Sequence, residues 1–187
     1  MGRRSQIALL TFAIAVAVYS VAGQTPTNSP PSKAVLDKDR QYFFAQVAAF
    51  KKSGRAGYSD EMAREKAGDC PHAASTQDTV TCLRQEIDKT TTNYTTYVNA
   101  LRSVEGLSNT GETNAGATGG QYLSAEERVK EFDDVEAAWQ TYHKAQCSAA
   151  YDAYRGGTIA PIIDLTCHLS LMRGRMRELE NIYQFMH

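Results

Sequence analysis

The chain has 187 residues, with 20 basic and 21 acidic side chains and a formal net charge of −1. This balance argues against nucleic-acid binding, which calls for a strongly basic face. The length is enough for one hydrophobic core of ordinary size, so a single folded domain is the simplest expectation.

Residues 1–23 have the organisation of a secretory signal peptide. Arg3 and Arg4 precede an apolar run from Ile7 to Val18, and small residues at 20–23 suit signal peptidase. An uncleaved membrane anchor is the alternative, but the run is shorter than the about 20 residues that a spanning helix needs. We therefore predict a periplasmic or secreted protein without stable membrane insertion. No cysteine stands at the cleavage region, so lipid attachment is not expected.

The segment that follows predicts a linker and then a first helix. Residues 24–34 are rich in Pro, Ser and Thr, which favours a flexible linker. An N-terminal helix is expected within residues 35–57, ending at Gly54 and Gly57, with a further short helix over 59–66. Residues 58–187 then form the main helical domain.

A long second helix is expected after Ser75, because Ser75 and Asp78 are spaced as a helix cap. Its apolar residues repeat every seven positions in two series, which predicts a buried seam. The first series is Val80, Ile87, Tyr94 and Leu101, and the second is Leu83, Thr90, Tyr97 and Val104. Residues 105–121 are glycine-rich and without apolar periodicity, so they predict a mobile loop.

The last third of the sequence predicts a helical hairpin. Ser124 and Glu127 form a capping box for a helix that should carry Val129, Phe132, Trp139 and Tyr142 inward. Gly156 and Gly157 should end that helix, and Pro161 suits the first turn of the next, which is expected over 159–185. Its buried stripe is predicted to comprise Ile162, Leu165, Leu169, Met172, Met176 and Leu179.

The four cysteines favour two disulfides in an exported chain, and four cysteines can pair in three ways. Cys147 and Cys167 each lie ten residues from Gly157 along the predicted hairpin. They should therefore meet at the same level, which pairs Cys147 with Cys167 and leaves Cys70 with Cys82. The expected fold is all-α, with antiparallel helical hairpins or a bundle stapled by these two bridges.

Several of these residues together carry a family resemblance. In the C-terminal half they are Ala138, Trp139, Tyr142, Cys147, Gly156, Gly157, Thr158, Pro161, Cys167, Leu171, Arg175 and Leu179, and upstream they are Asp69, Cys70, Cys82 and Leu83. In this spacing they resemble the lysozyme inhibitor LprI-like family over about residues 60–183. The chain departs from the family pattern at His143, where arginine is usual, and at Met172, where threonine is usual. The resemblance implies a secreted, envelope-associated helical protein, some of whose relatives bind and inhibit lysozyme.

Two chemical alternatives compete with this interpretation. Zinc could be held by Cys70, His72 and Cys82, or by His143, Cys147, Cys167 and His168. Export favours oxidised cysteines instead, so we predict no metal and no cofactor. Glycoside hydrolysis would need two facing carboxylates, one of them with a raised pKa in an apolar cleft. The acidic residues at 126, 127, 131, 133, 134 and 136 are instead clustered on one helix and interleaved with Arg128 and Lys130, as on a solvated face. We predict that the protein is not an enzyme.

The sequence thus predicts a non-enzymatic binding protein, and the family resemblance implies lysozyme as the candidate partner. Acidic groups would meet a cationic enzyme, and the residues proposed for this contact are Glu112, Asp133, Asp134 and Glu136. The alternative function is a structural or scaffolding helical module of the bacterial envelope without inhibitory activity. Trp139 and Arg175 could also contact a partner, but periodicity favours a core position for Trp139. An arginine in the position of Arg175 more often pairs with an acidic residue of the neighbouring helix or caps carbonyls at the hairpin turn.

Overall fold

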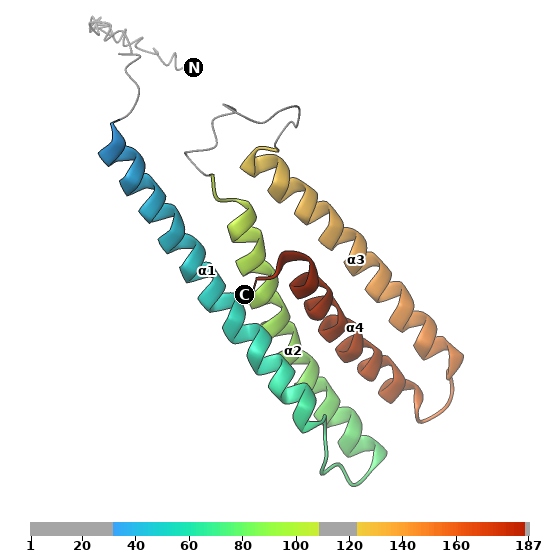
Figure 1. Cartoon of the computed structure of the whole chain (residues 1–187). Helices are drawn as coiled ribbons and strands as arrows, with labels where there is room; N and C mark the ends of the chain where they lie inside the picture. The colour runs from blue at the N-terminus through green and yellow to red at the C-terminus, as the bar shows by residue number, and fades with distance from the viewer. Residues whose placement is uncertain (1–31, 109–122, 186–187) are drawn as a thin grey trace, which may run out of the picture. The chain divides into compact units, whose positions relative to one another are not determined.

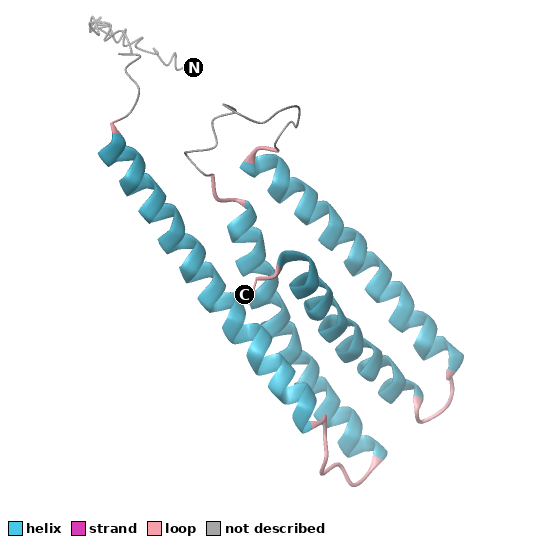
Figure 2. Ribbon diagram, viewed as in Figure 1, coloured by secondary structure: helices cyan, strands magenta, loops and turns pink. Residues whose placement is uncertain are grey.

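The computed structural model describes residues 32–108 and 123–185, which lie within one compact unit, Ser32–His187. In this part the chain forms four helices and no strand (Figures 1 and 2). They are α1 (Lys33–Ala67), α2 (Thr76–Glu105), α3 (Ala125–Ala153) and α4 (Ala160–Tyr183). The predicted all-α fold of antiparallel hairpins is confirmed.

The two hairpins join through α2 and α4. α2 packs against α1 on one side and against α4 on the other, while α3 packs mainly against α4 (Figure 1). α1 and α3 do not contact each other in the described residues. The two helices therefore lie at opposite edges of the bundle and present separate surfaces.

α1 is one continuous helix, so the expected end at Gly54 and Gly57 is wrong. Both glycines are buried where α1 approaches α2. A Cβ atom on Gly57 would lie 2.8 Å from the main-chain oxygen of Asn93, and one on Gly54 would lie 3.0 Å from Cβ of Ala100. The glycines thus permit close helix packing, and α1 ends later, at Gly68 with φ +86°.

The core lies between α2, α3 and α4 and follows the predicted seams of α2 and α4. Its buried residues are Tyr94, Tyr97, Ala100, Leu101, Phe132, Met172, Met176, Leu179 and Phe185. Trp139 is partly buried against this cluster and stacks on Tyr94, with ring centroids 5.3 Å apart. The core position predicted for Trp139 is thus confirmed.

The inward face of α3 differs from the prediction at one aromatic residue. Tyr142 is 54% exposed, whereas its neighbour His143 is buried at 6%. The buried positions of α3 are Phe132, Glu136, His143 and Cys147. Two of these four are polar, so apolar periodicity alone does not reveal the buried stripe.

The signals at the other helix ends, at Ser75, Ser124, Gly156 and Pro161, behave as predicted. The Ser75 side chain accepts a hydrogen bond from the Asp78 N–H at 3.1 Å, and Ser124 and Glu127 form a complete capping box. Between α3 and α4, Gly156 adopts φ +88°, and Pro161 lies in the first turn of α4. These features position the α3–α4 hairpin and the residues it carries.

Candidate protein-binding surface and its supporting clusters

The helix α3 carries the strongest net charge of the described helices. It has seven acidic and three basic side chains, a net charge of −4, whereas α1 has eight basic and five acidic, a net charge of +3. Acidic residues in the first turn of α3 also interact favourably with the helix dipole. Because α1 and α3 do not touch, these opposite charges stay separated at the two edges of the bundle.

We call Glu126, Glu131, Asp133 and Asp134 the acidic α3 surface. Glu126, Glu131 and Asp134 are exposed. Asp133 accepts hydrogen bonds from Nε and Nη2 of Arg102 at 2.7 and 2.8 Å, and this interaction holds the pKa of its carboxyl below the ordinary value. Asp134 pairs with Lys130 at 2.6 Å. Asp133 and Asp134 are thus accessible, each beside one cation.

The other two acidic candidates are not part of this surface. Glu112 lies outside the described residues. Glu136 is buried on the inner side of α3, where Tyr94 donates a hydrogen bond to it at 2.6 Å and Arg175 donates one from Nε at 3.0 Å. Glu136 therefore serves inside the bundle, and its predicted place among surface contacts needs correction.

Arg175 links this buried cluster across the hairpin. It joins Glu136 on α3, donates to Glu178 on α4 at 2.8 Å, and lies over the Trp139 ring at 5.9 Å from the centroid. Burial would lower the pKa of its guanidinium, but the two carboxylates outweigh burial and raise it. The expected ion pair between Arg175 and a neighbouring helix is confirmed.

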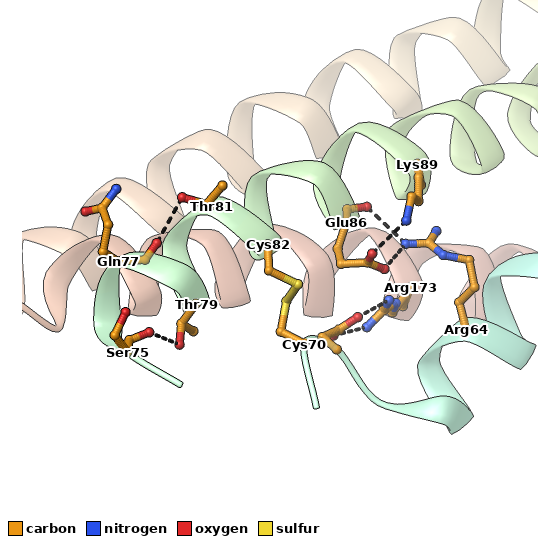
Figure 3. Close-up of a disulfide and its surroundings, with 11 residues drawn as sticks. Arg64, Cys70, Ser75, Gln77, Thr79, Thr81, Cys82, Glu86, Lys89 and Arg173 are labelled. Atoms are coloured by element: carbon orange, nitrogen blue, oxygen red, sulfur yellow. Dashed lines mark hydrogen bonds and ion pairs between the residues drawn. A yellow bond between two sulfur atoms is a disulfide. The ribbon is translucent and has the colours of Figure 1, made fainter. Parts of the chain in front are cut away.

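Both predicted disulfides are present. Cys70 pairs with Cys82 and Cys147 pairs with Cys167, with Cα–Cα distances of 5.9 and 5.5 Å, and the described residues hold no free cysteine. Figure 3 shows the first bridge beside ion pairs that involve Arg64 and Arg173. Because all four sulfurs are oxidised, neither cysteine-containing zinc set can form in this state.

The ion pairs in Figure 3 belong to a buried network that the sequence patterns did not reveal. Arg173 on α4 donates to Glu61 on α1 at 2.7 Å and, through both terminal nitrogens, to Asp69 at 2.6 and 2.9 Å. Arg64 joins Glu61 at 2.6 Å and also pairs with Glu86 on α2. This network fixes α1 to α2 and α4, and the apolar pattern of α1 alone does not predict it.

A histidine pair forms a second polar cluster, and the sequence grouped its members only as part of a zinc set with cysteines. Nε2 of His143 on α3 lies 2.9 Å from Nδ1 of His168 on α4, and Nε2 of His168 lies 3.5 Å from Oδ1 of Asp164. Burial, followed by the charges of His168 and Lys144, lowers the pKa of His143. The sequence held a signal for this contact. His143 lies four residues before Cys147 and His168 follows Cys167, so the disulfide between these cysteines brings the two histidines together.

No helix in the described part of the chain has the length and apolarity to cross a membrane.

Comparison with protein families gives a match to the lysozyme inhibitor LprI family over residues 70–179. The chain belongs to the lysozyme inhibitor LprI family. This LprI match includes both disulfides, α2, α3 and most of α4, whereas α1 precedes it. The disulfides and LprI membership fit an extracytoplasmic protein. No curated protein and no solved structure matches the chain.

Proposed function

We propose that this protein is exported, is not an enzyme and inhibits lysozyme by binding to it. Membership of a family described as lysozyme inhibitors is the observation that carries this proposal. In the proposed organisation, residues 1–23 direct export, residues 24–32 form a linker that is shorter than the expected 24–34 because α1 begins at Lys33, and the helical bundle binds the enzyme.

The acidic α3 surface is the contact region we favour. It lies on the most acidic described helix, at the edge of the bundle opposite the basic helix α1. A cationic enzyme would therefore be attracted to the α3 edge and repelled by the α1 edge, which orients the encounter. Inhibition would then be steric, because a bundle held by two disulfides and buried ion pairs can cover a cleft without deforming.

The direct test is the loss of turbidity of a bacterial cell-wall suspension treated with lysozyme, in the presence and absence of the purified, oxidised and exported protein. We expect a dose-dependent slowing that disappears after the disulfides are reduced. No slowing at a large molar excess over several lysozymes would contradict the inhibitory function.

A matched pair of triple variants tests the contact region. Glu126→Gln, Glu131→Gln and Asp134→Asn together neutralise three of the four carboxylates of the acidic α3 surface and keep Asp133, which ties α3 to Arg102 on α2. The control is Asp37→Asn, Asp88→Asn and Asp152→Asn, which removes the same charge from exposed positions elsewhere. We expect weaker inhibition only for the first variant. An equal loss in both would indicate an effect of net charge and would argue against this surface.

Exposed apolar residues on α1 favour a second candidate function, that of a scaffolding module of the envelope. Val35, Leu36, Tyr42 and Phe44 on the first half of α1 are 49%, 39%, 68% and 60% exposed. Val35 and Tyr42 lie seven residues apart on one face of α1 and Phe44 lies on the opposite face, so two apolar faces of this helix are available to a protein partner. Reproducible recovery of one envelope protein on the immobilised wild type, lost with Tyr42→Ser and Phe44→Ser, together with no binding of lysozyme, would favour this function.

A further inference from the structure

The histidine pair between α3 and α4 is unlike the ion pairs of the bundle, because two imidazole ring nitrogens face each other in place of a cation and a carboxylate. His143 is buried and His168 is partly exposed, and their facing nitrogens are 2.9 Å apart. His168 also borders a surface cavity of about 410 Å³ that Lys144, Ser148, Tyr151 and Asp164 line with it. The cavity gives solvent a route to the pair.

We propose that His143 Nε2 and His168 Nδ1 form a binding site for a divalent transition metal of the class that prefers imidazole ligands, such as Cu²⁺ or Zn²⁺. Two nitrogens 2.9 Å apart, each bound to an ion at about 2.0 Å, subtend about 90° at the metal, which is a usual angle in tetragonal sites. The nitrogens now face each other across a hydrogen bond, so both rings would rotate to turn their lone pairs toward the ion. A tetrahedral ion, which needs a separation of about 3.3 Å, would also move the rings apart by about 0.4 Å. Water from the cavity would complete the coordination.

The proton arrangement fits this role. Asp164 faces Nε2 of His168 at 3.5 Å and favours a proton on that nitrogen, which leaves Nδ1 of His168 with a free lone pair. In that tautomer, Nε2 of His143 carries the proton of the hydrogen bond between the rings and donates it to Nδ1 of His168. On metal binding this proton moves from Nε2 to Nδ1 of His143, so both facing nitrogens become ligands without net proton release. Asp164 is a positioning residue in this arrangement and not a ligand.

The neighbouring cysteine does not complete the ligand set in the oxidised protein. The ligand atoms of His143, Cys147 and His168 all lie within 4.8 Å of one another, but Cys147 is bonded to Cys167. Two imidazoles and water therefore form the proposed site. Lys144 borders the same cavity and opposes cation binding, which predicts a site of moderate affinity.

Trp139 provides an internal reporter for this site. It is the only tryptophan in the chain, and its ring centroid lies 4.8 Å from that of His143. Bound Cu²⁺ quenches a tryptophan at this range. We expect titration of the oxidised protein with Cu²⁺ to quench the fluorescence at one equivalent, and excess Zn²⁺, which does not quench, to restore it.

Two double variants, each lacking two of the four histidines, provide the decisive comparison. His143→Gln with His168→Gln removes the proposed site, whereas His72→Gln with His187→Gln keeps it. We expect at least tenfold weaker Cu²⁺ binding for the first and an unchanged titration for the second. Asp164→Asn should weaken binding about tenfold, as expected for loss of a carboxylate that orients a ligating histidine.

Near-UV circular dichroism checks that the fold survives, and the single variant His168→Gln, at the more exposed position, tests the site if the double variant unfolds. Electron paramagnetic resonance of the Cu²⁺ complex should show coupling to two nitrogens in the wild type and fewer in His168→Gln. Unchanged quenching in His168→Gln, or loss of quenching in the His72 and His187 variant, would overturn the proposal. The test is independent of lysozyme, so it stands whether or not the protein inhibits that enzyme.

Discussion

Arg173 on α4 and Glu61 on α1 form a buried ion pair at 2.7 Å, with side chains 4% and 0% exposed, across 112 residues of sequence. Glu61 also accepts hydrogen bonds from Thr90 at 2.7 Å and Asn93 at 3.0 Å on α2. The carboxylate of Glu61 is thus the point at which three helices meet. The pair matters because α1 lies outside the family-matched region and needs a specific attachment to it.

Arg173→Ala should destabilise the bundle strongly, because it leaves Glu61 and Asp69 without their shared cation. Breaking a buried ion pair on one side typically costs about 3–5 kcal/mol. We expect a loss of about 3 kcal/mol, since Arg64 still contacts Glu61. Urea unfolding followed by circular dichroism measures the effect. Lys130→Ala, which breaks an exposed pair, should change stability by less than about 1 kcal/mol, and equal losses in the two variants would contradict this account.

Replacing two helical glycines by alanine should change the stability of the protein in opposite directions. Gly57→Ala should be destabilising, because its Cβ would meet the main-chain oxygen of Asn93 at 2.8 Å. A Cβ atom on Gly174 of α4 would have no neighbouring atom within 4 Å, so Gly174→Ala should stabilise the protein by about 0.5–1 kcal/mol through helix propensity. Thermal unfolding of both variants provides the comparison. A stabilising Gly57→Ala would mean that α1 and α2 are not in close contact there.

The Cys147–Cys167 bridge should contribute about 3 kcal/mol by restricting the unfolded chain, as estimated for a loop of this size. The double variant Cys147→Ala and Cys167→Ala should therefore lower the thermal midpoint by about 6–12 °C. The single variant Cys147→Ser should also lower it and leave Cys167 as a free thiol. An unchanged midpoint under oxidising conditions would show that the bridge does not support the native state.

The ionised carboxylate of Glu86 should stabilise the folded protein in a way that is lost in acid. Burial alone would raise the pKa of its carboxyl, but hydrogen bonds from Arg64 and Lys89 outweigh burial and hold the pKa below its ordinary value. Because the folded pKa is below the unfolded value of about 4.3, the stabilisation is present above that pH and disappears as pH falls through the folded pKa. The free energy of unfolding of Glu86→Gln should therefore fall less below about pH 4 than that of the wild type. Glu131→Gln, at an exposed position, should follow the wild type.

Binding to lysozyme through the acidic α3 surface should weaken with salt. Attraction between exposed charges is largely screened beyond about 8 Å at physiological ionic strength and beyond about 3 Å in 1 M salt. We expect the association rate with lysozyme to fall severalfold across this range while the dissociation rate changes less. Surface plasmon resonance at a series of salt concentrations measures both rates. A salt-independent association rate would remove the electrostatic part of the proposed function.

Features that depend on near neighbours in the chain were predictable from the residues alone. The caps at Ser75 and Ser124, the left-handed Gly156, the heptad seam of α2 and the pairing of Cys147 with Cys167 follow from local spacing, because helix geometry converts spacing into position. The family resemblance rested on the same local features. Local spacing in the sequence was therefore sufficient to determine the class of fold.

Features that depend on a distant partner were not predictable in this way. From the sequence, Gly57 suggests a helix end, whereas in the structure it allows close packing against Asn93 of α2. Glu136 likewise suggests a surface carboxylate, whereas in the structure Arg175 and Tyr94 donate hydrogen bonds to it inside the bundle. The burial of His143 was likewise hidden, since its partner His168 lies on another helix. A polar side chain can be buried when its partner is buried with it, and no periodicity in one helix reveals a partner that another helix supplies.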